Sequence, residues 1–372
     1  MNIGPILGIL SIPRSNGIPF GGGQSESFTE ILITAEKMNC IAFVFSPLDI
    51  DWSKNAVWGY RYNWKIQPGE WERDLFPLPS IIYNRIPNRT MENREVIKHI
   101  LVLLKQKYGS RFFNPCFLDK WKTHAILCSN RQTLAFLPET VRLYNPKVIP
   151  EMLGRHGSVY LKPSANSLGN EICKVTKLGR GKFFFIHQSL NQQRREGLVS
   201  NCHELLAELP PINESSEYLV QQAISLAECE GQPFDLRLLI QKNRLGEWQR
   251  TGMAARIAGI GGITTHVFYG GIRYPAEKAI REAALNHGFS PEKIKKQLKK
   301  IELIFPEVIE QASGESFGEL EMDLGIDRRG KVWFFEANSK PFRFDEKLIR
   351  AKSLVKLIRY VHYLDESGNL GH

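Results

Sequence analysis

The chain has no stretch of about 18 uncharged apolar residues, so the sequence contains no candidate transmembrane helix. Its six cysteines include no Cys-x-x-Cys pair, and most of them lie within apolar runs. This distribution argues against a disulfide framework or a zinc site and favours reduced, buried thiols in a cytosolic protein. The first ten residues have neither a basic flank nor a small-residue cleavage site, so we expect a strand there rather than a signal peptide.

Motifs of nucleic-acid binding are also missing. There is no RRM, zinc-finger or basic-zipper pattern, so nucleic acid is not the expected partner. The glycines at 21–23 lack the spacing of a dinucleotide fingerprint or a P-loop, and they can form either a simple turn or a phosphate-binding loop. The formal net charge of +10 nevertheless favours polyanionic partners, such as nucleotide phosphates, acidic peptides or an anionic polymer. A generally basic surface without a specific site is the alternative.

The length of 372 residues predicts two or three packed units, and a hydrophobic content of 42% is ordinary for a globular protein. Apolar runs at 5–12 and 40–45 flank helical spacing over 25–38, an order typical of a parallel βαβ unit. The Trp- and Pro-rich stretch 51–79 is expected to be irregular or a hairpin.

Further elements follow from periodicity and turn residues. Strands 158–162 and 171–175 are expected to form a hairpin across a polar loop rich in Ser, Asn and Gly. Strands 234–241 and 248–258 are expected to be antiparallel neighbours. Further strands are predicted at 80–84 and 218–224, helices at 91–108, 119–129, 292–312 and 348–364, and a helix with a linker over 190–217. The last helix is basic and amphipathic, and packing on the body is favoured over a membrane role.

The segment 317–341 contains the clearest chemical signal. It reads as two strands joined by a turn at Asp327, and it presents oxygen ligands for a hard cation such as Mg²⁺ from Asp323, Glu336 and Asn338. Asp323 lies in an otherwise apolar strand, where a lone carboxylate is costly unless it is paired or bound to metal. Glu319 and Glu321 lie on the same face of that strand by period two and could substitute as ligands.

Cationic and small residues earlier in the chain suit the phosphates that usually accompany Mg²⁺. Lys120 begins a helix and Lys162 ends a strand, so each can neutralise phosphate charge or be an ordinary surface lysine. The loop 164–170 can bring backbone N–H groups close to a γ-phosphate, because small residues allow close approach. Its polar members include Ser164, Asn166 and Ser167. The short strand 219–224 could offer backbone groups to an adenine.

Two arginines can face the same cleft. Asp235 and Arg237 share a strand face, and Arg237 and Arg256 can bind a phosphoryl group or a carboxylate bidentately. An Asp235–Arg237 salt bridge is an equally open interpretation. His266 is either a base or a satisfied polar partner, and the neighbouring threonines are expected to bond locally. Lys340 either reaches substrate or phosphate or lies in solvent.

In combination, these features resemble the ATP-grasp superfamily, and most closely the YheC/YheD endospore coat-associated family of spore-forming Firmicutes. The resemblance covers roughly residues 115–365 and depends on the joint order of its motifs. The motifs are Val159-Tyr-Leu-Lys-Pro-Ser164, Phe234-Asp-Leu-Arg-Leu-Leu-Ile-Gln241, Thr251-Gly-Met-Ala-Ala-Arg-Ile-Ala-Gly259, Gly262-Ile-Thr-Thr-His-Val-Phe-Tyr-Gly-Gly271, Gly318-Glu-Leu-Glu-Met-Asp323 and Phe335-Glu-Ala-Asn-Ser-Lys-Pro341.

The resemblance implies an α/β and α+β architecture, namely an ATP-grasp fold preceded by a Rossmann-like pre-ATP-grasp domain. The implied domains are 1–115 for this N-terminal α/β domain, 116–217 for the A subdomain with the phosphate loop, and 218–372 for the B subdomain with the metal site and C-terminal helix.

The resemblance also implies ATP and Mg²⁺ as cofactors and assigns the site. The implied ATP-binding residues are Lys120, Lys162, Ser164, Asn166, Ser167, Gln221, Gln222, Ile224, Asp235 and His266, with the adenine hinge at Gln221, Gln222 and Ile224. Asp323, Glu336 and Asn338 would bind the metal, and Arg237 and Arg256 would be the catalytic residues.

The implied function is carboxylate–amine ligation through an acylphosphate, on a peptide or another acidic substrate, in sporulation. The expected location is the mother-cell cytoplasm, in association with the endospore coat, whose proteins are candidate partners. The alternatives are an ATP-binding structural protein without turnover and an ATP-grasp kinase. Many ATP-grasp ligases have an arginine where this chain has Glu321, so that role is either empty or moved to Arg237, Arg256 or Arg343.

Overall fold

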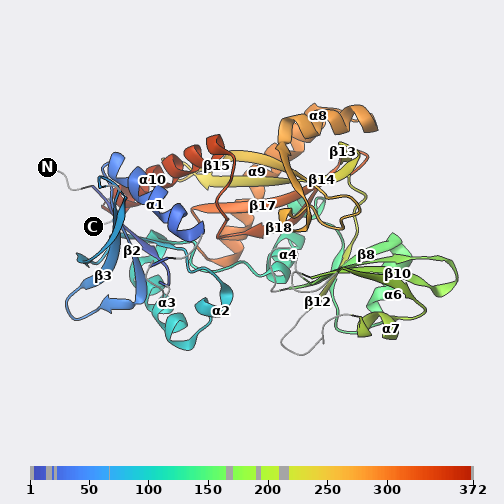
Figure 1. Ribbon diagram of the computed structural model, residues 1–372, viewed down its shortest axis with the longest axis horizontal. Helices are drawn as coiled ribbons and strands as arrows, with labels where there is room; N and C mark the ends of the chain where they lie inside the picture. The colour runs from blue at the N-terminus through green and yellow to red at the C-terminus, as the bar shows by residue number, and fades with distance from the viewer. Residues whose placement is uncertain are drawn as a thin grey trace.

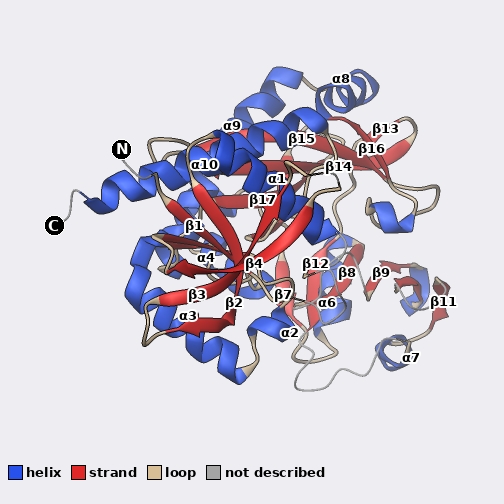
Figure 2. Ribbon diagram, turned by 60° about the vertical axis from the view of Figure 1, so that its left-hand side comes forward, coloured by secondary structure: helices blue, strands red, loops and turns tan. Residues whose placement is uncertain are grey.

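The computed structural model describes residues 4–13, 19–20, 23–66, 68–164, 171–189, 194–208 and 218–369 (Figure 1). Within these residues the strands form three sheets, which follow one another along the elongated molecule. The first sheet lies at the end that holds both termini, the second at the opposite end, and the third between them (Figures 1 and 2).

The first sheet has the order β4-β3-β2-β1-β5-β6. Its strands are β1 (Ile6–Leu10), β2 (Ile41–Asp51), β3 (Ala56–Asn63), β4 (Glu70–Pro77), β5 (Ile81–Asn84) and β6 (Phe112–Phe113), and its helices are α1 (Gly23–Lys37), α2 (Arg89–Glu92) and α3 (Glu95–Tyr108). β1 pairs in parallel with β2 and β5, so the expected βαβ unit is confirmed, and β3 and β4 form the hairpin in the Trp-rich stretch. The single helix expected over 91–108 is wrong, because the chain is extended at Arg94 between α2 and α3.

The second sheet has the order β11-β10-β9-β8-β12-β7. Its elements are β7 (Thr140–Arg142), β8 (Ser158–Pro163), β9 (Ile172–Lys177), β10 (Phe183–Gln188), β11 (Arg195–Val199), β12 (Tyr218–Gln222), α6 (Val148–His156) and α7 (Cys202–Ala207). The β8–β9 hairpin is confirmed. The helix and linker expected over 190–217 missed β11, while residues 190–193 and 209–217 of that stretch lie outside the described part of the chain.

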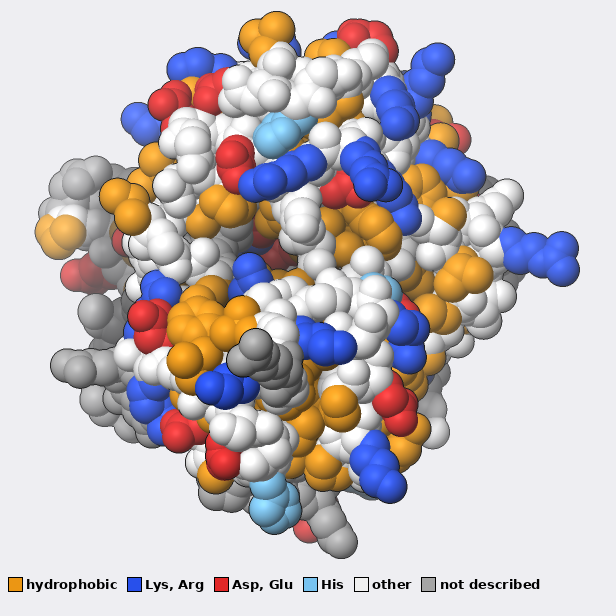
Figure 3. All heavy atoms as spheres, turned by 90° about the vertical axis from the view of Figure 1, so that its right-hand side faces the viewer, with side chains coloured by type: hydrophobic (Ala, Val, Ile, Leu, Met, Phe, Trp, Pro, Cys, Tyr) orange, Lys and Arg blue, Asp and Glu red, His pale blue; other side chains and the backbone are white. Residues whose placement is uncertain are grey.

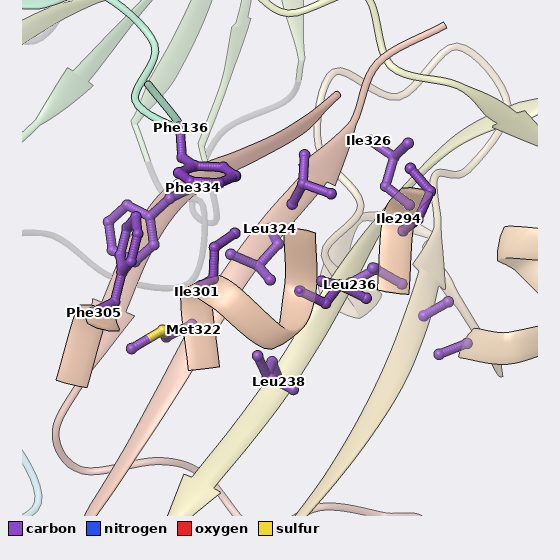
Figure 4. Packing of buried hydrophobic residues seen from close by; sticks show 14 of the residues in the cluster. Phe136, Leu236, Leu238, Ile294, Ile301, Phe305, Met322, Leu324, Ile326 and Phe334 are labelled. Atoms are coloured by element: carbon purple, nitrogen blue, oxygen red, sulfur yellow. The ribbon is translucent and has the colours of Figure 1, made fainter. Parts of the chain in front are cut away.

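The third sheet has the path β16-β15-β14-β17-β18, with β13 paired to β14. Its elements are β13 (Glu228–Cys229), β14 (Gln232–Lys242), β15 (Trp248–Ile257), β16 (Ile272–Pro275), β17 (Glu319–Ile326), β18 (Val332–Asn338), α8 (Ala276–His287) and α9 (Pro291–Ser313). One face of this sheet packs against α9, with Leu236, Leu238 and Met322 beside Ile301 and Phe305 (Figure 4). The opposite face is therefore left for polar side chains, because strand residues alternate between faces.

The remaining helices connect and cover these sheets. They are α4 (Lys120–Cys128), α5 (Arg131–Leu134) and α10 (Lys347–Asn369), with short 3-10 turns at Gly109–Arg111, Gly179–Gly181 and Val267–Tyr269. Leu357 and Val361 of α10 pack with Phe28 and Ile31 of α1, which confirms that the basic C-terminal helix packs on the body. Among the described residues no helix is long and apolar enough to cross a membrane, and all six cysteines are unpaired.

Candidate functional site

Acidic and basic side chains gather on the face of the third sheet that points away from α9. Antiparallel pairing places Arg237 of β14 opposite Asp323 of β17, and β17 in turn pairs Asp323 with Glu336 and Glu321 with Asn338 on β18. Residues that pair directly across strands lie on the same face of a sheet. The three predicted metal ligands therefore lie on one face, with Arg237 beside them.

Three carboxylates of β17 each meet an arginine from a different segment of the chain, and we call this arrangement the carboxylate–guanidinium row. Glu319 lies 3.5 Å from Arg85 (Oε1 to Nη1), and Asp323 lies 2.8 Å from Arg256 (Oδ2 to Nη2). Between them, Nη2 of Arg237 donates to Glu321. Successive members are two residues apart, so the row follows one face of the strand toward the first sheet.

Asp235 pairs with Arg256 and not with Arg237, so the interpretation of an Asp235–Arg237 salt bridge is wrong. Arg256 donates from Nε to Oδ1 at 2.9 Å and from Nη2 to Oδ2 at 2.6 Å, and Thr265 Oγ1 donates to Oδ2 at 2.6 Å. Burial opposes the charge on Arg256, but Asp235 and Asp323 together raise its pKa. The expectation that the threonines bond locally is also wrong, because Thr264 accepts from Gln188 of the second sheet at 3.0 Å.

Two lysines lie near Glu336, another of the metal-ligand candidates. Lys120 Nζ lies 3.2 Å from Glu336 Oε2, and the buried Lys162 donates from Nζ to Gln221 Oε1 at 2.8 Å. Burial opposes ionisation of Glu336, but Lys120 and Lys162 lower its pKa to about 2. Burial, helped by the charge of Lys120, lowers the pKa of Lys162 to about 8.

These lysines line a hollow where α4, β8, β12 and β18 meet. Figure 3 shows the surface hollowed between the part that carries α8 and the part formed by the second sheet, with acidic side chains visible in its depth. Lys120, Lys162, Gln221 and Glu336, which lie far apart in the sequence, all contribute to the wall. The structure therefore brings together both lysines, one hinge candidate and one metal-ligand candidate.

Sequence reasoning missed His124 and Thr140, which also line this hollow. His124 lies four residues after Lys120, so helical spacing on α4 could have indicated it. Burial lowers the pKa of His124 to about 4, so this side chain is neutral near pH 7. Thr140 Oγ1 accepts from Gln221 Nε2 at 2.9 Å and so fixes the amide that holds Lys162.

Three buried polar atoms at the site have no hydrogen-bond partner in the described part of the chain: Asp323 Oδ1, Arg237 Nε and His266 Nδ1. Burial raises the pKa of Asp323 to about 7, and Arg256 opposes this effect. An orphaned carboxylate oxygen beside Glu336 and Asn338 suits a cation that also takes phosphate oxygens as ligands. Among the described residues no group of three or more His, Cys, Asp and Glu side chains is arranged to hold a metal alone.

The other predicted site residues have varied surroundings. Ser164 is buried and donates to Asp119 at 3.3 Å (Oγ to Oδ2), next to the start of α4. Gln222 accepts from the backbone N–H of Glu139 at 3.2 Å (Oε1 to N), and Ile224 lies just beyond β12 and is half-buried. Asn166 and Ser167 lie outside the described residues.

Two further expectations concerned basic residues after the metal-ligand strand. The alternative that Lys340 lies in solvent is wrong, because it is buried and donates to Glu92 at 2.5 Å (Nζ to Oε1). Arg343 pairs with Glu26 and Glu30 of α1. His266 stacks on Phe268, and burial together with Arg256 lowers its pKa.

Comparison with known proteins gives a consistent result. A family model described as YheC/D like ATP-grasp matches residues 109–364. The endospore coat-associated protein YheD of Bacillus subtilis (strain 168) is 32% identical over 375 residues, covering 99% of this chain and 80% of that protein. The endospore coat-associated protein YheC of the same strain is 22% identical over 350 residues, covering 91% and 88%.

Solved structures show the same fold at low sequence identity. D-alanine–D-alanine ligase from Bacillus anthracis, complexed with ATP, matches with a TM-score of 0.55 and 12% identity, covering 99% of this chain and 100% of that one. The macrocyclase MdnC from Microcystis aeruginosa MRC, bound with its precursor peptide MdnA, matches with a TM-score of 0.52 and 13% identity, covering 95% and 99%.

Proposed function

The chain belongs to the YheC/D-like ATP-grasp family, and on this premise we propose that it is an ATP- and Mg²⁺-dependent carboxylate–amine ligase. The observation that supports this most strongly is the single polar face shared by two structural features. One is the lysine-lined hollow, and the other is the carboxylate–guanidinium row, in which carboxylates of β17 meet arginines from elsewhere in the chain. A ligase that activates a carboxylate with ATP needs both features within reach of each other.

ATP would occupy the lysine-lined hollow. Lys120 and Lys162 would contact the phosphates as point charges, and Gln221 would hold Lys162 in position through its 2.8 Å hydrogen bond. Gln222 and Ile224, at the end of β12, would lie beside the adenine. The low pKa of Lys162 reflects a buried cation without a full complement of counter-charges, which phosphate oxygens would supply.

Mg²⁺ would be held by Asp323, Glu336 and Asn338 together with phosphate oxygens. When bound, it would supply positive charge that offsets the negative charge developing on the phosphates during transfer. The chain's own residues keep the carboxylates ready for this role. Arg256 and Lys120 hold Asp323 and Glu336 in place at 2.8 and 3.2 Å.

Arg237 is the better candidate for stabilising the oxyanion of the tetrahedral intermediate. Arg256 is engaged by Asp235 and Asp323, whereas Arg237 keeps a buried Nε without a partner among the described residues. In the proposed reaction the γ-phosphoryl group of ATP moves to a substrate carboxylate, which gives ADP and an acylphosphate. An amine then attacks the acyl carbon, phosphate leaves, and the amine loses a proton.

The substrate would be a peptide or another acidic molecule, and the net charge of +10 supports an anionic partner. The relatives YheD and YheC are both named as endospore coat-associated. We therefore place the activity in sporulation, in the mother-cell cytoplasm and at the coat, with coat proteins as candidate partners.

A second candidate is a nucleotide-binding structural protein without turnover. One observation favours it: the carboxylates of Asp323 and Glu336 are already ion-paired, so a cation must compete with Arg256 and Lys120. An ATP-grasp kinase that stops at phosphoryl transfer is the third candidate.

One assay separates the three. The protein is incubated with Mg·ATP and panels of peptides and amines, and ADP, phosphate and product mass are followed for wild type, Glu336→Gln and the exposed control Glu307→Gln on α9. An amide product with ADP and phosphate, lost only in Glu336→Gln, supports the ligase. A phosphorylated product without amide selects the kinase, and ATP affinity without ADP above the Glu336→Gln background selects the structural protein.

A further inference from the structure

A second hollow lies where α1, α10 and β17 meet, at the other end of the carboxylate–guanidinium row. Figures 1 and 2 both show α1 and α10 side by side over the first sheet at this end of the molecule. Its floor contains Arg85 and Glu319, its rim contains Arg343 and Arg350, and Leu239 and Phe344 are among its apolar lining residues.

The acidic groups of this hollow already have partners. Glu319 accepts from Tyr83 and, at 3.0 Å (Oε2 to Nε2), from Gln241, and it lies 3.5 Å from Arg85. Glu30 at the rim pairs with Arg350 at 3.3 Å (Oε1 to Nε). A cationic ligand would find no unpaired carboxylate here, so the hollow is not suited to a metal or an amine.

Guanidinium groups, in contrast, retain unused donors. Within the described residues, Arg350 makes its one side-chain ion pair through Nε, and its side chain keeps 24% of its surface exposed. Its two terminal nitrogens carry four further N–H donors in a planar fork, which matches the geometry of a carboxylate. The apolar lining beside this fork suits a ligand whose carboxylate is attached to an apolar group.

The distance to the metal-ligand candidates sets the length of the ligand. Glu319 and Asp323 are four residues apart on β17, which corresponds to roughly 13 Å along a strand. An extended peptide covers at most about 3.3–3.6 Å per residue, so about four residues are needed to reach from one end to the other. Arg237 lies between the two ends, beside Glu321.

We infer that the second hollow binds the terminal carboxylate of a peptide whose reacting group lies about four residues away, at Asp323. The peptide carries an apolar C-terminal residue in the hollow and an acidic side chain at its reacting end, and its middle residues pass Arg237. This inference rests on the proposed function for the identity of the reacting end, but the binding of the carboxylate does not require turnover.

The test uses binding alone. Acetyl-Glu-Ala-Ala-Phe with a free carboxylate, its C-terminal carboxamide, and acetyl-phenylalanine are titrated calorimetrically into the full chain at millimolar concentration. The variants are Arg350→Ala and, as a matched control, Arg359→Ala, which removes an exposed arginine from the same helix. ATP affinity is measured in parallel for each variant.

The carboxylate peptide should bind wild type about 10-fold or more tightly than the carboxamide, and Arg350→Ala should lose about the same factor, as expected for a charge-assisted hydrogen bond. Arg359→Ala should bind like wild type, and ATP affinity should be unchanged in both variants. Arg237→Ala should weaken the tetrapeptide but not acetyl-phenylalanine, which is too short to reach that side chain.

Three results would each overturn the inference. They are equal binding of the acid and the carboxamide, equal binding by Arg350→Ala and Arg359→Ala, and no binding of the carboxylate peptide to wild type. An effect of Arg237→Ala on acetyl-phenylalanine equal to that on the tetrapeptide would overturn the assigned direction of the peptide. Failure of the proposed function is distinct, because it would appear as absent ATP affinity while the acid-selective peptide binding persists.

Discussion

Replacement of Lys162 by methionine should change nucleotide affinity and stability in opposite directions. Lys162 is 8% exposed, and its Nζ donates to Gln221 Oε1 at 2.8 Å. Methionine fills similar space without the charge, so it removes a proposed phosphate contact and also removes a buried cation. A lysine with only a structural role would not produce both effects.

The magnitudes follow from the surroundings of this lysine. The fall of the pKa of Lys162 from 10.5 to about 8 corresponds to about 3 kcal/mol of disfavoured charge, at about 1.4 kcal/mol per pKa unit. Methionine also leaves Gln221 Oε1 without its donor, which costs about 1 kcal/mol. The nucleotide-free variant should therefore be more stable by about 2 kcal/mol, or roughly 3 °C in melting temperature.

The affinity for ATP should fall by about 10- to 100-fold, the range for loss of a charge-assisted hydrogen bond. Melting temperature without nucleotide and ATP affinity are measured at pH 7 for wild type, Lys162→Met and Lys177→Met. Lys177 is an exposed lysine of β9 in the same sheet, and its variant should behave like wild type in both measurements.

The stability difference should depend on pH with a definite sign. Below pH 8 the folded and unfolded chains both carry the charged amine, so the whole penalty of burying it is present in wild type. Between pH 8 and 10.5 the unfolded chain binds more protons than the folded chain, so wild-type stability rises and the advantage of Lys162→Met shrinks. A variant that is less stable than wild type at pH 7, or that binds ATP normally, would refute the reasoning.

Substitutions at three other positions test the polar face and its connection to the first sheet. Asp235→Asn should lower the melting temperature by an amount equivalent to about 3 kcal/mol, because it leaves Arg256 short of a buried counter-charge; an unchanged melting curve would contradict this. Asn114→Ala should lower the free energy of unfolding by about 3 kcal/mol, because the Asn114 side chain accepts from Gly318 N–H and donates to two backbone carbonyls. Asn114→Gly should lower it by about 1 kcal/mol less, because φ is +53° at this position and glycine adopts that conformation without strain. In the ligase assay, Arg237→Lys should keep ATP affinity and lose amide formation by about 100-fold or more, and equal rates would exclude its oxyanion role.

Alternation and turn chemistry were sufficient to predict most of the fold. β17 combines an apolar core face with a polar face, and α9 carries Ile301 and Phe305 at core spacing, so both were recognisable from the sequence alone. β11 was not, because Val199 is its one buried residue and an exposed edge strand has no period-two signal. The extended break at Arg94 has no glycine or proline to announce it.

The pairing of charged side chains at the site could not be predicted, because it depends on register and on distant elements. Period two puts Asp235 and Arg237 on one face, but the register of β14 against β15 places Arg256 directly opposite Asp235. For Lys340 the sequence left a ligand contact and exposure to solvent as the two possibilities. In the structure its side chain donates to Glu92, which lies 248 residues away in the sequence. Such contacts are set by tertiary packing, which no local pattern contains.

Glu321 illustrates how a position can change while the local chemistry is kept. The resemblance to ATP-grasp ligases leads one to expect an arginine there, and the sequence alone left its role either empty or moved. In the structure, Arg237 lies opposite Asp323 on the neighbouring strand, so Glu321, two residues away, is its diagonal neighbour. The guanidinium of Arg237 donates from Nη2 to the carboxylate of Glu321. This contact fixes Nη2, while Nε of Arg237 has no partner in the described part of the chain. A carboxylate at 321 therefore need not remove the positive charge from this part of the site, because it can orient an arginine supplied from β14.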